Sequence, residues 1–255
     1  MIKKRIDRRR FMIRAAQATG LIVLSGCDKL SQSEWFPRLL GSAEGLTRGV
    51  HRIVTPRKAL AREYNEADRS AIFPTNGNID PDNPHYQALA RNDFADWKLT
   101  VSGLVERPIE FSLSDLRRFP SRSQITRHDC VEGWSAIAKW KGVPLSDLLN
   151  RVRPLPSARY IVFHCADPDE TGQKYYESID FDDAYHPQTI LAYEINDRVL
   201  PTAHGAPIRL RLERQLGYKM AKYVMRIELV ESFKSIGGGN GGYWEDQGYE
   251  WYAGI

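Results

Sequence analysis

Short runs of β-branched and aromatic residues, separated by turn residues, constrain the fold of this chain more than any other feature. The strongest run, residues 160–165 (Tyr-Ile-Val-Phe-His-Cys), is typical of a strand inside a sheet. Weaker alternating runs predict further strands at residues 97–101, 189–193, 198–200, 208–212 and 223–230. Asn196 and Asp197 separate two of these runs and predict a hairpin turn.

Two short helices are predicted between the strands. Ser112 and Asp115 form a capping-box pattern at the start of the first helix, and Pro120 ends it. Residues 143–152 predict the second helix, because Pro144 lies in its first turn and four aliphatic residues share one face. Short helices mixed with mostly antiparallel strands predict an α+β domain. At 255 residues, the chain is long enough for one large domain with a sizeable core.

Changes in composition divide the sequence into four segments. Residues 1–27 form a basic leader, and residues 28–85 form a proline-containing extension that is expected to pack on the core, with a weak helical pattern at residues 45–64. Residues 86–232 form the expected α+β domain. Residues 233–255 form an arm rich in glycine and aromatic residues. Its glycine run lacks the helix and lysine of a phosphate-binding loop, so we expect its aromatic side chains to dock on the domain.

The basic charge of the chain is concentrated in the leader. The formal net charge is +4, but residues 1–26 hold seven Lys or Arg and one acid. The remainder therefore has 36 − 7 = 29 bases and 32 − 1 = 31 acids. This balance argues against a nucleic-acid-binding domain, which would carry a basic surface.

The leader has the features of an export signal. Residues 8–12 (Arg-Arg-Arg-Phe-Met) follow the twin-arginine pattern and precede a modestly apolar stretch, residues 15–26. That stretch is shorter than the roughly 20 apolar residues of a membrane-spanning helix. Residues 24–27 (Leu-Ser-Gly-Cys) are also typical of a lipobox with a lipid anchor at Cys27, and an ordinary signal peptide cut near Gly26 is the alternative. The leader therefore predicts a periplasmic protein, with or without a membrane anchor.

Cys130 follows a β-like stretch in the run 127–134 (Arg-His-Asp-Cys-Val-Glu-Gly-Trp). Its thiolate is a soft ligand suited to a transition metal, and a single cysteine leaves other coordination positions to another ligand. Further along, residues 204–209 (His-Gly-Ala-Pro-Ile-Arg) and 217–219 (Gly-Tyr-Lys) offer cationic groups and glycine backbone suited to a phosphorylated cofactor. A disulfide between Cys130 and Cys165 is the alternative in an oxidising compartment.

These segments, in this order and spacing, resemble the sulfite oxidase superfamily over about residues 90–230. The resemblance implies a sulfite oxidase-type fold and a Mo-molybdopterin cofactor, with Cys130 as the ligand of molybdenum and a catalytic residue. Sulfite oxidases continue into an immunoglobulin-like dimerisation domain, whereas about 25 residues follow Val230 here. We therefore expect that domain to be absent and the protein to be a monomer.

The resemblance also implies further cofactor contacts. His204 and Arg209 fall at the pterin and phosphate contacts of the family, since a planar guanidinium matches phosphate oxygens. Gly217 and Tyr218 are expected to add backbone contacts, and Lys219 an ammonium group.

Four more site residues follow from the same resemblance. Asn92 matches an asparagine that contacts the pterin, and Arg91 matches an arginine that faces the substrate oxyanion in sulfite-oxidising members. A solvated surface arginine is the alternative for Arg91. Cys165 occupies the place of a small polar pterin contact. Tyr175 matches the active-site tyrosine of sulfite oxidases, although Tyr176 is the alternative for the inward-facing side chain.

The resemblance implies an exported molybdenum-dependent oxidoreductase that moves an oxygen atom to or from a small molecule. Arg91 favours a sulfite-like anion, whereas the layout is similar to the periplasmic methionine-sulfoxide-reducing branch and favours an S-oxide or N-oxide. No Cys-x-x-Cys-His haem motif is present, so a separate cytochrome or quinone-linked membrane subunit is the expected electron partner. A disulfide at Cys130 would instead favour an exported lipoprotein that serves as a binding or assembly module without molybdenum.

Overall fold

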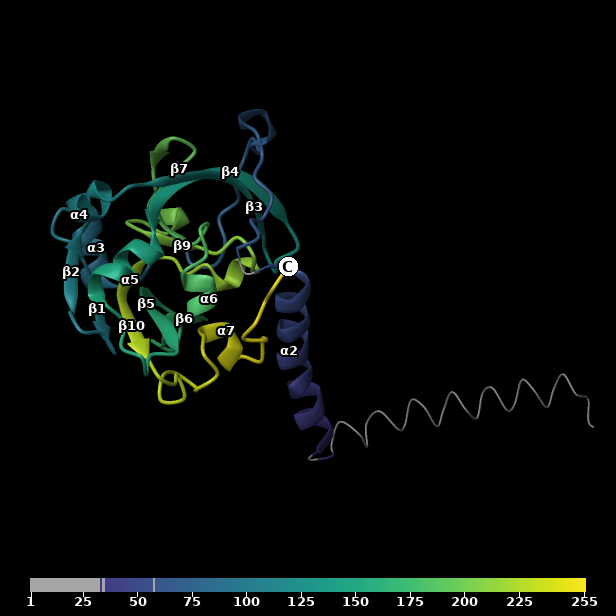
Figure 1. Cartoon of the computed structure of the whole chain (residues 1–255). Coiled ribbons are helices and arrows are strands. Elements are labelled where there is room, and N and C mark those ends of the chain that lie inside the picture. Colours follow the sequence, from purple (N-terminus) through teal and green to yellow (C-terminus); the bar gives the residue numbers. More distant parts are fainter. Residues whose placement is uncertain (1–32, 34, 57) are drawn as a thin grey trace, which may run out of the picture. The chain divides into compact units, whose positions relative to one another are not determined.

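The computed structural model describes residues 33, 35–56 and 58–255 (Figure 1). It contains two units, Met1–His51 and Arg52–Ile255, and each is described by itself. Helix α2 (Trp35–Val54) accounts for most of the described part of the first unit and the first residues of the second. The twin-arginine pattern and Cys27 lie outside the described residues.

The first sheet of the second unit has five strands in the order β2-β1-β10-β5-β6. Its strands are β1 (Lys98–Gly103), β2 (Ile109–Ser112), β5 (Tyr160–Pro168), β6 (Lys174–Asp180) and β10 (Val224–Val230). β1 and β10 run parallel, and the other neighbouring pairs are antiparallel. β5 lies between β10 and β6, which confirms the predicted strand inside a sheet.

The second sheet has the order β3-β4-β7-β8, with β9 paired to β7, and every pair is antiparallel. Its strands are β3 (Arg122–Asp129), β4 (Ser135–Pro144), β7 (Ile190–Ile195), β8 (Arg198–Val199) and β9 (Arg209–Arg211). The chain turns between β7 and β8 at Asn196 and Asp197, whose φ angles are 50° and 63°. Asn and Asp tolerate this left-handed conformation, so the predicted hairpin turn is confirmed.

Short helices connect the strands. They are η1 (Glu66–Asp68), α3 (Pro84–Arg91), α4 (Leu113–Arg118), α5 (Leu145–Val152), α6 (Phe181–Ala184), η2 (Thr202–His204), η3 (Gly217–Lys219) and α7 (Tyr243–Asp246). The predicted capping box begins α4, because Ser112 and Asp115 each accept a hydrogen bond from the other's backbone N–H. The second predicted helix began two residues too early, since Val143 and Pro144 belong to β4. Short helices and mostly antiparallel strands confirm the α+β fold.

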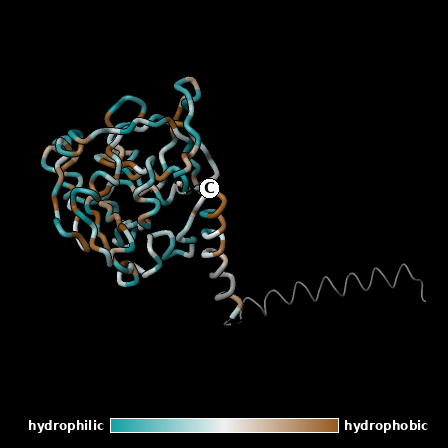
Figure 2. Tube along the Cα trace, in the orientation of Figure 1, coloured by the Kyte–Doolittle hydropathy of each residue, from teal (hydrophilic) through white to brown (hydrophobic). Residues whose placement is uncertain are grey.

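The largest core cluster joins α5 to strands of the first sheet. α5 contributes a face of four fully buried side chains, Leu145, Leu148, Leu149 and Val152. Burial of such aliphatic side chains stabilises the fold by about 1.5–3 kcal/mol each. Apolar and hydrophilic residues are mixed along the chain (Figure 2). No helix within the described ranges has the length and apolar character needed to cross a membrane.

The segment between α2 and α3 lies along the second sheet. The N–H of Tyr64 donates to the carbonyl of Ile125 at 2.9 Å. Phe73 is buried with its ring centroid 5.3 Å from that of Trp140 in β4. These contacts hold the chain in place just before the turn at residues 76–78, which lines the same cavity as Cys130.

The C-terminal arm folds back onto the second unit. The ring of Trp251 stacks on Phe233, with an interplanar angle of 27°, and meets the edge of Tyr160 in β5. The N–H of Leu216 donates to the carbonyl of Ala253 at 2.9 Å. The arm is therefore bound by both aromatic packing and backbone hydrogen bonds.

Candidate functional site

Cys130 lies in the tight turn between β3 and β4. Its N–H donates to the carbonyl of Trp134 at 2.9 Å, and the N–H of Gly133 donates to the carbonyl of Cys130 at 3.1 Å. Gly133 has a φ of 88°, a conformation that glycine adopts without a steric penalty. Burial raises the pKa of the Cys130 thiol, partly offset by a hydrogen bond from the backbone of Glu132. The hairpin thus presents a half-buried thiol at the end of two strands.

A cavity of about 380 Å³, which we call the Cys130 cavity, lies beside this thiol. Its wall combines the turn at residues 76–78, the β3–β4 hairpin, the end of β5, the start of β6, η3 and the C-terminal arm. The charged residues in the wall are Glu132, Asp167, Asp169 and Lys222. Segments that are far apart in the sequence therefore meet at one concave site.

Tyr175 forms part of the cavity wall, whereas Tyr176 points toward the C-terminal arm. The hydroxyl of Tyr175 donates to the carbonyl of Tyr218, so its oxygen is left to act as an acceptor. The hydroxyl of Tyr176 donates to Asp246 at 2.6 Å. Successive strand residues point to opposite faces, and Tyr175 is the one that faces the cavity.

The C-terminal arm adds aromatic side chains to the cavity wall. Tyr243 stacks on Tyr175 with ring centroids 5.5 Å apart, and Trp244 stacks on Tyr249 at 5.3 Å. Tyr249 also meets the edge of Tyr218 at 5.2 Å. The sequence predicted that the arm's aromatic residues contact the domain, but it did not predict that they line the site.

Arg209 is fully buried and packs against Trp140, with its Cζ 5.5 Å from the ring centroid. Its Nη1 donates to the carbonyl of His204 at 3.4 Å, while its Nε and Nη2 have no partner among the described residues. His204 Nδ1 is likewise buried without a partner in this part of the chain. Burial, and then repulsion from Arg211, lower the pKa of Arg209 to about 9. Buried donors without acceptors are costly, so Arg209 favours an anionic ligand, and His204 Nδ1 adds a second polar atom open to that ligand.

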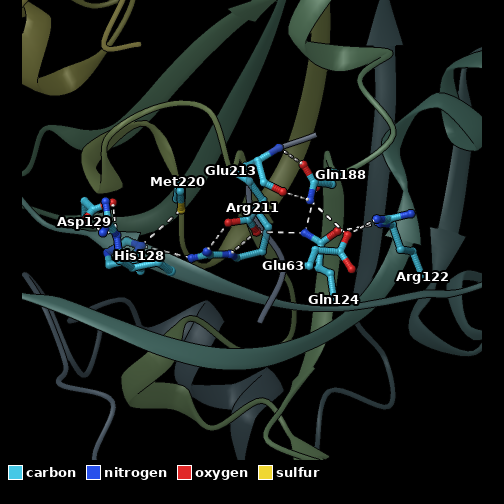
Figure 3. Close-up of polar contacts among 11 residues, drawn as sticks. Glu63, Arg122, Gln124, His128, Asp129, Gln188, Arg211, Glu213 and Met220 are labelled. Carbon is cyan, nitrogen blue, oxygen red and sulfur yellow. Dashed lines mark hydrogen bonds and ion pairs between the residues drawn. The ribbon is translucent and has the colours of Figure 1, made fainter. Parts of the chain in front are cut away.

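A buried hydrogen-bond network holds the end of β3 against β9 (Figure 3). Arg211 donates to His128 Nδ1 at 3.1 Å and to both carboxylate oxygens of Glu213, at 3.0 and 2.7 Å. Burial, with repulsion from Arg209 and Arg211, lowers the pKa of His128 well below its ordinary value. The ring is therefore neutral and its Nδ1 can accept. This network fixes the backbone two residues before Cys130.

Lys219 is buried between two carboxylates, Glu177 of β6 and Glu245 of α7, and forms an ion pair with each. Each of the three side chains is 1% exposed or less. Burial disfavours charge on Lys219, but attraction to the two carboxylates outweighs it and raises the pKa of the ammonium. Lys219 was predicted to contact a phosphate. In the structure its ammonium is engaged by these carboxylates, because the C-terminal arm brings Glu245 against it.

His204, Arg209 and Lys219 are not part of the wall of the Cys130 cavity, and three other predicted residues lie outside it as well. Arg91 is exposed in the last turn of α3, on the face opposite the buried residues of that helix. Asn92 is exposed, and its amide donates to Asp96 at 2.6 Å. Cys165 is buried in the core cluster of the first sheet, where burial raises the pKa of its thiol well above the ordinary value. The structure therefore does not bring these three side chains to the cavity.

Cys130 and Cys165 are both free thiols. The alternative prediction of a disulfide between them is therefore not realised in the described chain. The hypothesis of a binding module without molybdenum depended on that disulfide and loses its basis.

Two charged residues in the cavity wall, Asp167 and Lys222, are not among the site residues that the family resemblance implied. Asp167 lies at the end of β5, and Lys222 Nζ donates to the carbonyls of Asn76, at 2.6 Å, and Asn78. Asp167 lies two residues after the strand run 160–165, and this position at a strand end is the sequence signal that could have indicated it. Lys222 gave no such signal, because lysines near strand ends are commonly solvated.

A free thiol at a cavity, near a buried arginine with unpaired donors, is a combination suited to an anionic cofactor that is also bound through sulfur. The family model described as the oxidoreductase molybdopterin binding domain matches residues 85–235, and the chain belongs to this family, within the sulfite oxidase superfamily. The protein is therefore a molybdopterin-dependent oxidoreductase with a sulfite oxidase-type fold.

The chain is similar to several known proteins. The chain is 37% identical to YedZ1 of Azospira oryzae, whose name describes a protein-methionine-sulfoxide reductase subunit, over 97% of this chain and 87% of that protein. It is 38% identical to the protein-methionine-sulfoxide reductase catalytic subunit MsrP of Ralstonia nicotianae, over 53% of this chain and 44% of that protein. Among solved structures, the sulfane dehydrogenase SoxCD from Paracoccus pantotrophus is 25% identical with a TM-score of 0.49, over 55% of this chain and 40% of that chain.

The residues around Cys130 fit a molybdopterin cofactor. The Cys130 thiolate is a soft ligand for molybdenum. The unpaired donors of Arg209 and His204 suit the oxygen and nitrogen acceptors of a phosphorylated pterin. At Gly217 an added Cβ would lie 2.5 Å from the ring of His128, so glycine is required where this backbone lines the cavity.

Proposed function

We propose that the protein is the catalytic subunit of a periplasmic reductase for S-oxides, with the methionine sulfoxide side chain as its substrate. The two relatives YedZ1 and MsrP are described as subunits of protein-methionine-sulfoxide reductases, which supports the proposal. Cys130 would hold molybdenum, while Arg209 and His204 would bind phosphate and pterin groups and Gly217 and Tyr218 would line the cofactor. The observation that carries the choice of substrate is the charge of the cavity wall.

The wall of the Cys130 cavity is poorly suited to a sulfite-like anion. Among the described residues that form it, three acidic side chains face one basic side chain, Lys222, and one of the three, Asp167, has a pKa raised to about 7. Repulsion between charges of the same sign lowers the affinity of a binding surface for a ligand, so acidic residues in the wall disfavour an anion. Arg91, which favoured an anion, is exposed on α3 and does not line this cavity. A neutral S-oxide needs no compensating positive charge and is therefore favoured, with an N-oxide as the nearest alternative.

The aromatic part of the wall also suits a methyl thioether product. Sulfur near an aromatic ring gains about 0.3–1.5 kcal/mol. Tyr175, Tyr243, Trp244 and Tyr249 supply such rings around the cavity. This chemistry favours an S-oxide over an N-oxide.

Side chains of the protein would hold the cofactor and the substrate in place for the reaction. When bound, the cofactor supplies the two-electron chemistry of oxygen-atom transfer. Cys130 would hold it as a ligand, and the bond between Arg211 and His128 keeps the Cys130 turn in place. Tyr175 holds η3 through the carbonyl of Tyr218. The aromatic side chains of the arm line the cavity in which the sulfoxide would bind.

We expect the molybdenum-loaded protein to reduce dimethyl sulfoxide and a methionine-sulfoxide peptide with a reduced viologen as electron donor. Sulfite oxidation should have a kcat/KM at least about tenfold lower, because about 1.4 kcal/mol of like-charge repulsion already gives that ratio. Steady-state kinetics on the two substrate types measure this ratio. Faster turnover of sulfite than of either S-oxide would contradict the proposed substrate.

The electron partner and the quaternary state are also part of the proposal. We infer that electrons come from a separate cytochrome or a quinone-linked membrane subunit, since both relatives are named as subunits. The catalytic chain would act as a monomer, held at the membrane by a lipid on Cys27 if the lipobox is processed. The chain would consist of a leader (1–27), an extension (28–85), the molybdopterin-binding domain (86–232) and the C-terminal arm (233–255).

Export is expected to depend on the paired arginines of the leader. Changing Arg8, Arg9 and Arg10 to lysine should leave most of the protein in the cytoplasm, because the twin-arginine pattern is an address read by its receptor. Cell fractionation followed by immunodetection measures the distribution. Changing Lys3 and Lys4 to arginine is the control and should leave export intact. Normal periplasmic accumulation of the triple variant would show that another signal directs the protein.

A further inference from the structure

We propose that Asp167 donates a proton to the oxygen atom that leaves the substrate as water. This inference rests on the proposed reduction of an S-oxide in the Cys130 cavity. The carboxyl of Asp167 lies in the cavity wall together with Cys130, Tyr175 and Lys222. The hydroxyl of Tyr175 already donates its proton to the carbonyl of Tyr218.

Asp167 lies where β5 departs from regular pairing. The β5–β6 ladder is in register through His164 and resumes at Pro168, and the residues between them form an irregularity. Such bulges redirect side chains and are frequent beside active sites. Asp167 is 9% exposed, and its Oδ1 is buried with no hydrogen-bond partner among the described residues. A buried carboxyl oxygen without a partner favours either protonation or a bound ligand.

The other carboxylates of the wall are already engaged. Asp169 accepts from both the hydroxyl and the N–H of Thr171, and these bonds hold the pKa of Asp169 below its usual range. Glu132 is exposed and accepts from Trp134 Nε1 at 3.0 Å. Asp167 is therefore the wall carboxyl best placed to hold a proton for the reaction.

The surroundings of Asp167 keep its proton available near neutral pH. Burial raises the pKa of Asp167 to about 7, partly offset by its own N–H and by the positive charge of Lys222. Burial, and then repulsion from Arg209, lower the pKa of Lys222 to about 7. The titratable groups that interact electrostatically with Asp167 are Tyr86, Cys165, Tyr175, Lys222, Tyr223 and Tyr243. Asp167 is mainly protonated below about pH 7 and mainly ionised above it, so a step that uses its proton slows as pH rises.

The reaction balances with one proton from this carboxyl. The S–O bond of the sulfoxide breaks, and sulfur gains two electrons, which the viologen or the physiological electron carrier supplies by way of the cofactor. The oxygen atom takes two protons and leaves as water. One proton comes from the carboxyl of Asp167 and the other from solvent. Asp167 then regains its proton from solvent through the open side of the cavity.

The first test is Asp167→Asn in the molybdenum-loaded enzyme. Its kcat for sulfoxide reduction near pH 6 should fall by about 10²- to 10⁴-fold, the usual contribution of a general acid. Molybdenum content and KM should change little, and Asp167→Glu should recover part of the rate. Asp82→Asn is the matched control, because it removes the same charge from an exposed loop. An Asp167→Asn enzyme with wild-type kcat would overturn the proposal.

The pH profile separates Asp167 from Lys222, since both titrate near pH 7. In wild-type enzyme kcat should decline as pH rises through about 7, and Asp167→Asn should lose this decline. Lys222→Met removes a positive charge that stabilises the ionised carboxylate, so it should move the decline to higher pH. If the decline instead disappears in Lys222→Met and persists in Asp167→Asn, Lys222 is the titrating group and the proposal is overturned.

A measurement without turnover provides an independent check. Infrared difference spectra of the oxidised enzyme between about pH 6 and 8 should show a carboxylic-acid C=O band that is absent from Asp167→Asn. If no such band is assigned to Asp167, the proton-donor role fails even when sulfoxide reduction is observed. If wild-type enzyme does not reduce sulfoxides at all, while the band is present, the proposed substrate fails instead.

Discussion

Lys219→Ala is expected to lower the free energy of unfolding by about 3–5 kcal/mol, the usual cost of removing one partner from a buried ion pair. The substitution would leave Glu177 and Glu245 without their shared cation, in a place where neither side chain reaches solvent. It would also release α7, which carries aromatic residues of the cavity wall. Urea unfolding followed by circular dichroism measures the change.

Two further variants identify the cause of this loss. Lys174→Ala removes an exposed lysine from β6 and should change stability by less than about 0.5 kcal/mol. Lys219→Met combined with Gln at both Glu177 and Glu245 removes all three charges, and should recover much of the stability. If Lys219→Ala keeps full stability but loses cofactor, the phosphate contact predicted from the sequence is right and the ion-pair account is wrong.

Cys130→Ser is expected to abolish turnover and to leave the fold intact. A serine oxygen is a harder and weaker ligand for molybdenum than a thiolate, and it is close to isosteric in this half-buried turn. The measurements are molybdenum per chain and the rate of sulfoxide reduction, together with the thermal unfolding midpoint. Retained activity in Cys130→Ser would contradict the assignment of the metal ligand.

The other free thiol serves as the comparison. Cys165 lies in the apolar core cluster, so Cys165→Ala should lose some stability because it leaves a small void. It should keep its molybdenum, because the site retains Cys130. Loss of molybdenum in Cys165→Ala would instead support the pterin contact that the resemblance implied for Cys165.

Several predicted strands have apolar residues in their buried positions, but β4 was missed although Ala136, Ala138 and Trp140 are buried in it. β5 buries Ile161, Val162 and Phe163, which makes its run recognisable. β3 was missed as a complete strand because its inward positions are polar: Gln124 and His128 are fully or almost fully buried. The side chains of Gln124 and His128 form hydrogen bonds with Glu213 and Arg211, respectively. Every second residue of β3 is therefore buried, but these residues are polar and do not show the apolar alternation by which a strand is predicted.

The positions of several candidate site residues could be predicted where a local motif carries them, and their roles stay predictions. Cys130, Gly217 and Tyr218 line the cavity, and Arg209 is buried beside His204 with unpaired donors. Lys219 could not be placed correctly, because its partner Glu245 comes from a distant arm. Asp167 was equally hidden, since its raised pKa is created by burial, which a sequence does not display.

The residues that form the cavity wall are far apart in the sequence, so they are synthesised at different times. The wall extends from Asn76 to Tyr249, which are 249 − 76 = 173 positions apart. Domains emerge from the ribosome with their N-terminal parts first. The sheets can therefore begin to form while translation continues, but Tyr243, Trp244 and Tyr249 of the wall are made after the last strand of the sheets, β10. A nascent chain presents Cys130 in an incomplete site, and the wall closes around its ligand only after translation has passed Tyr249.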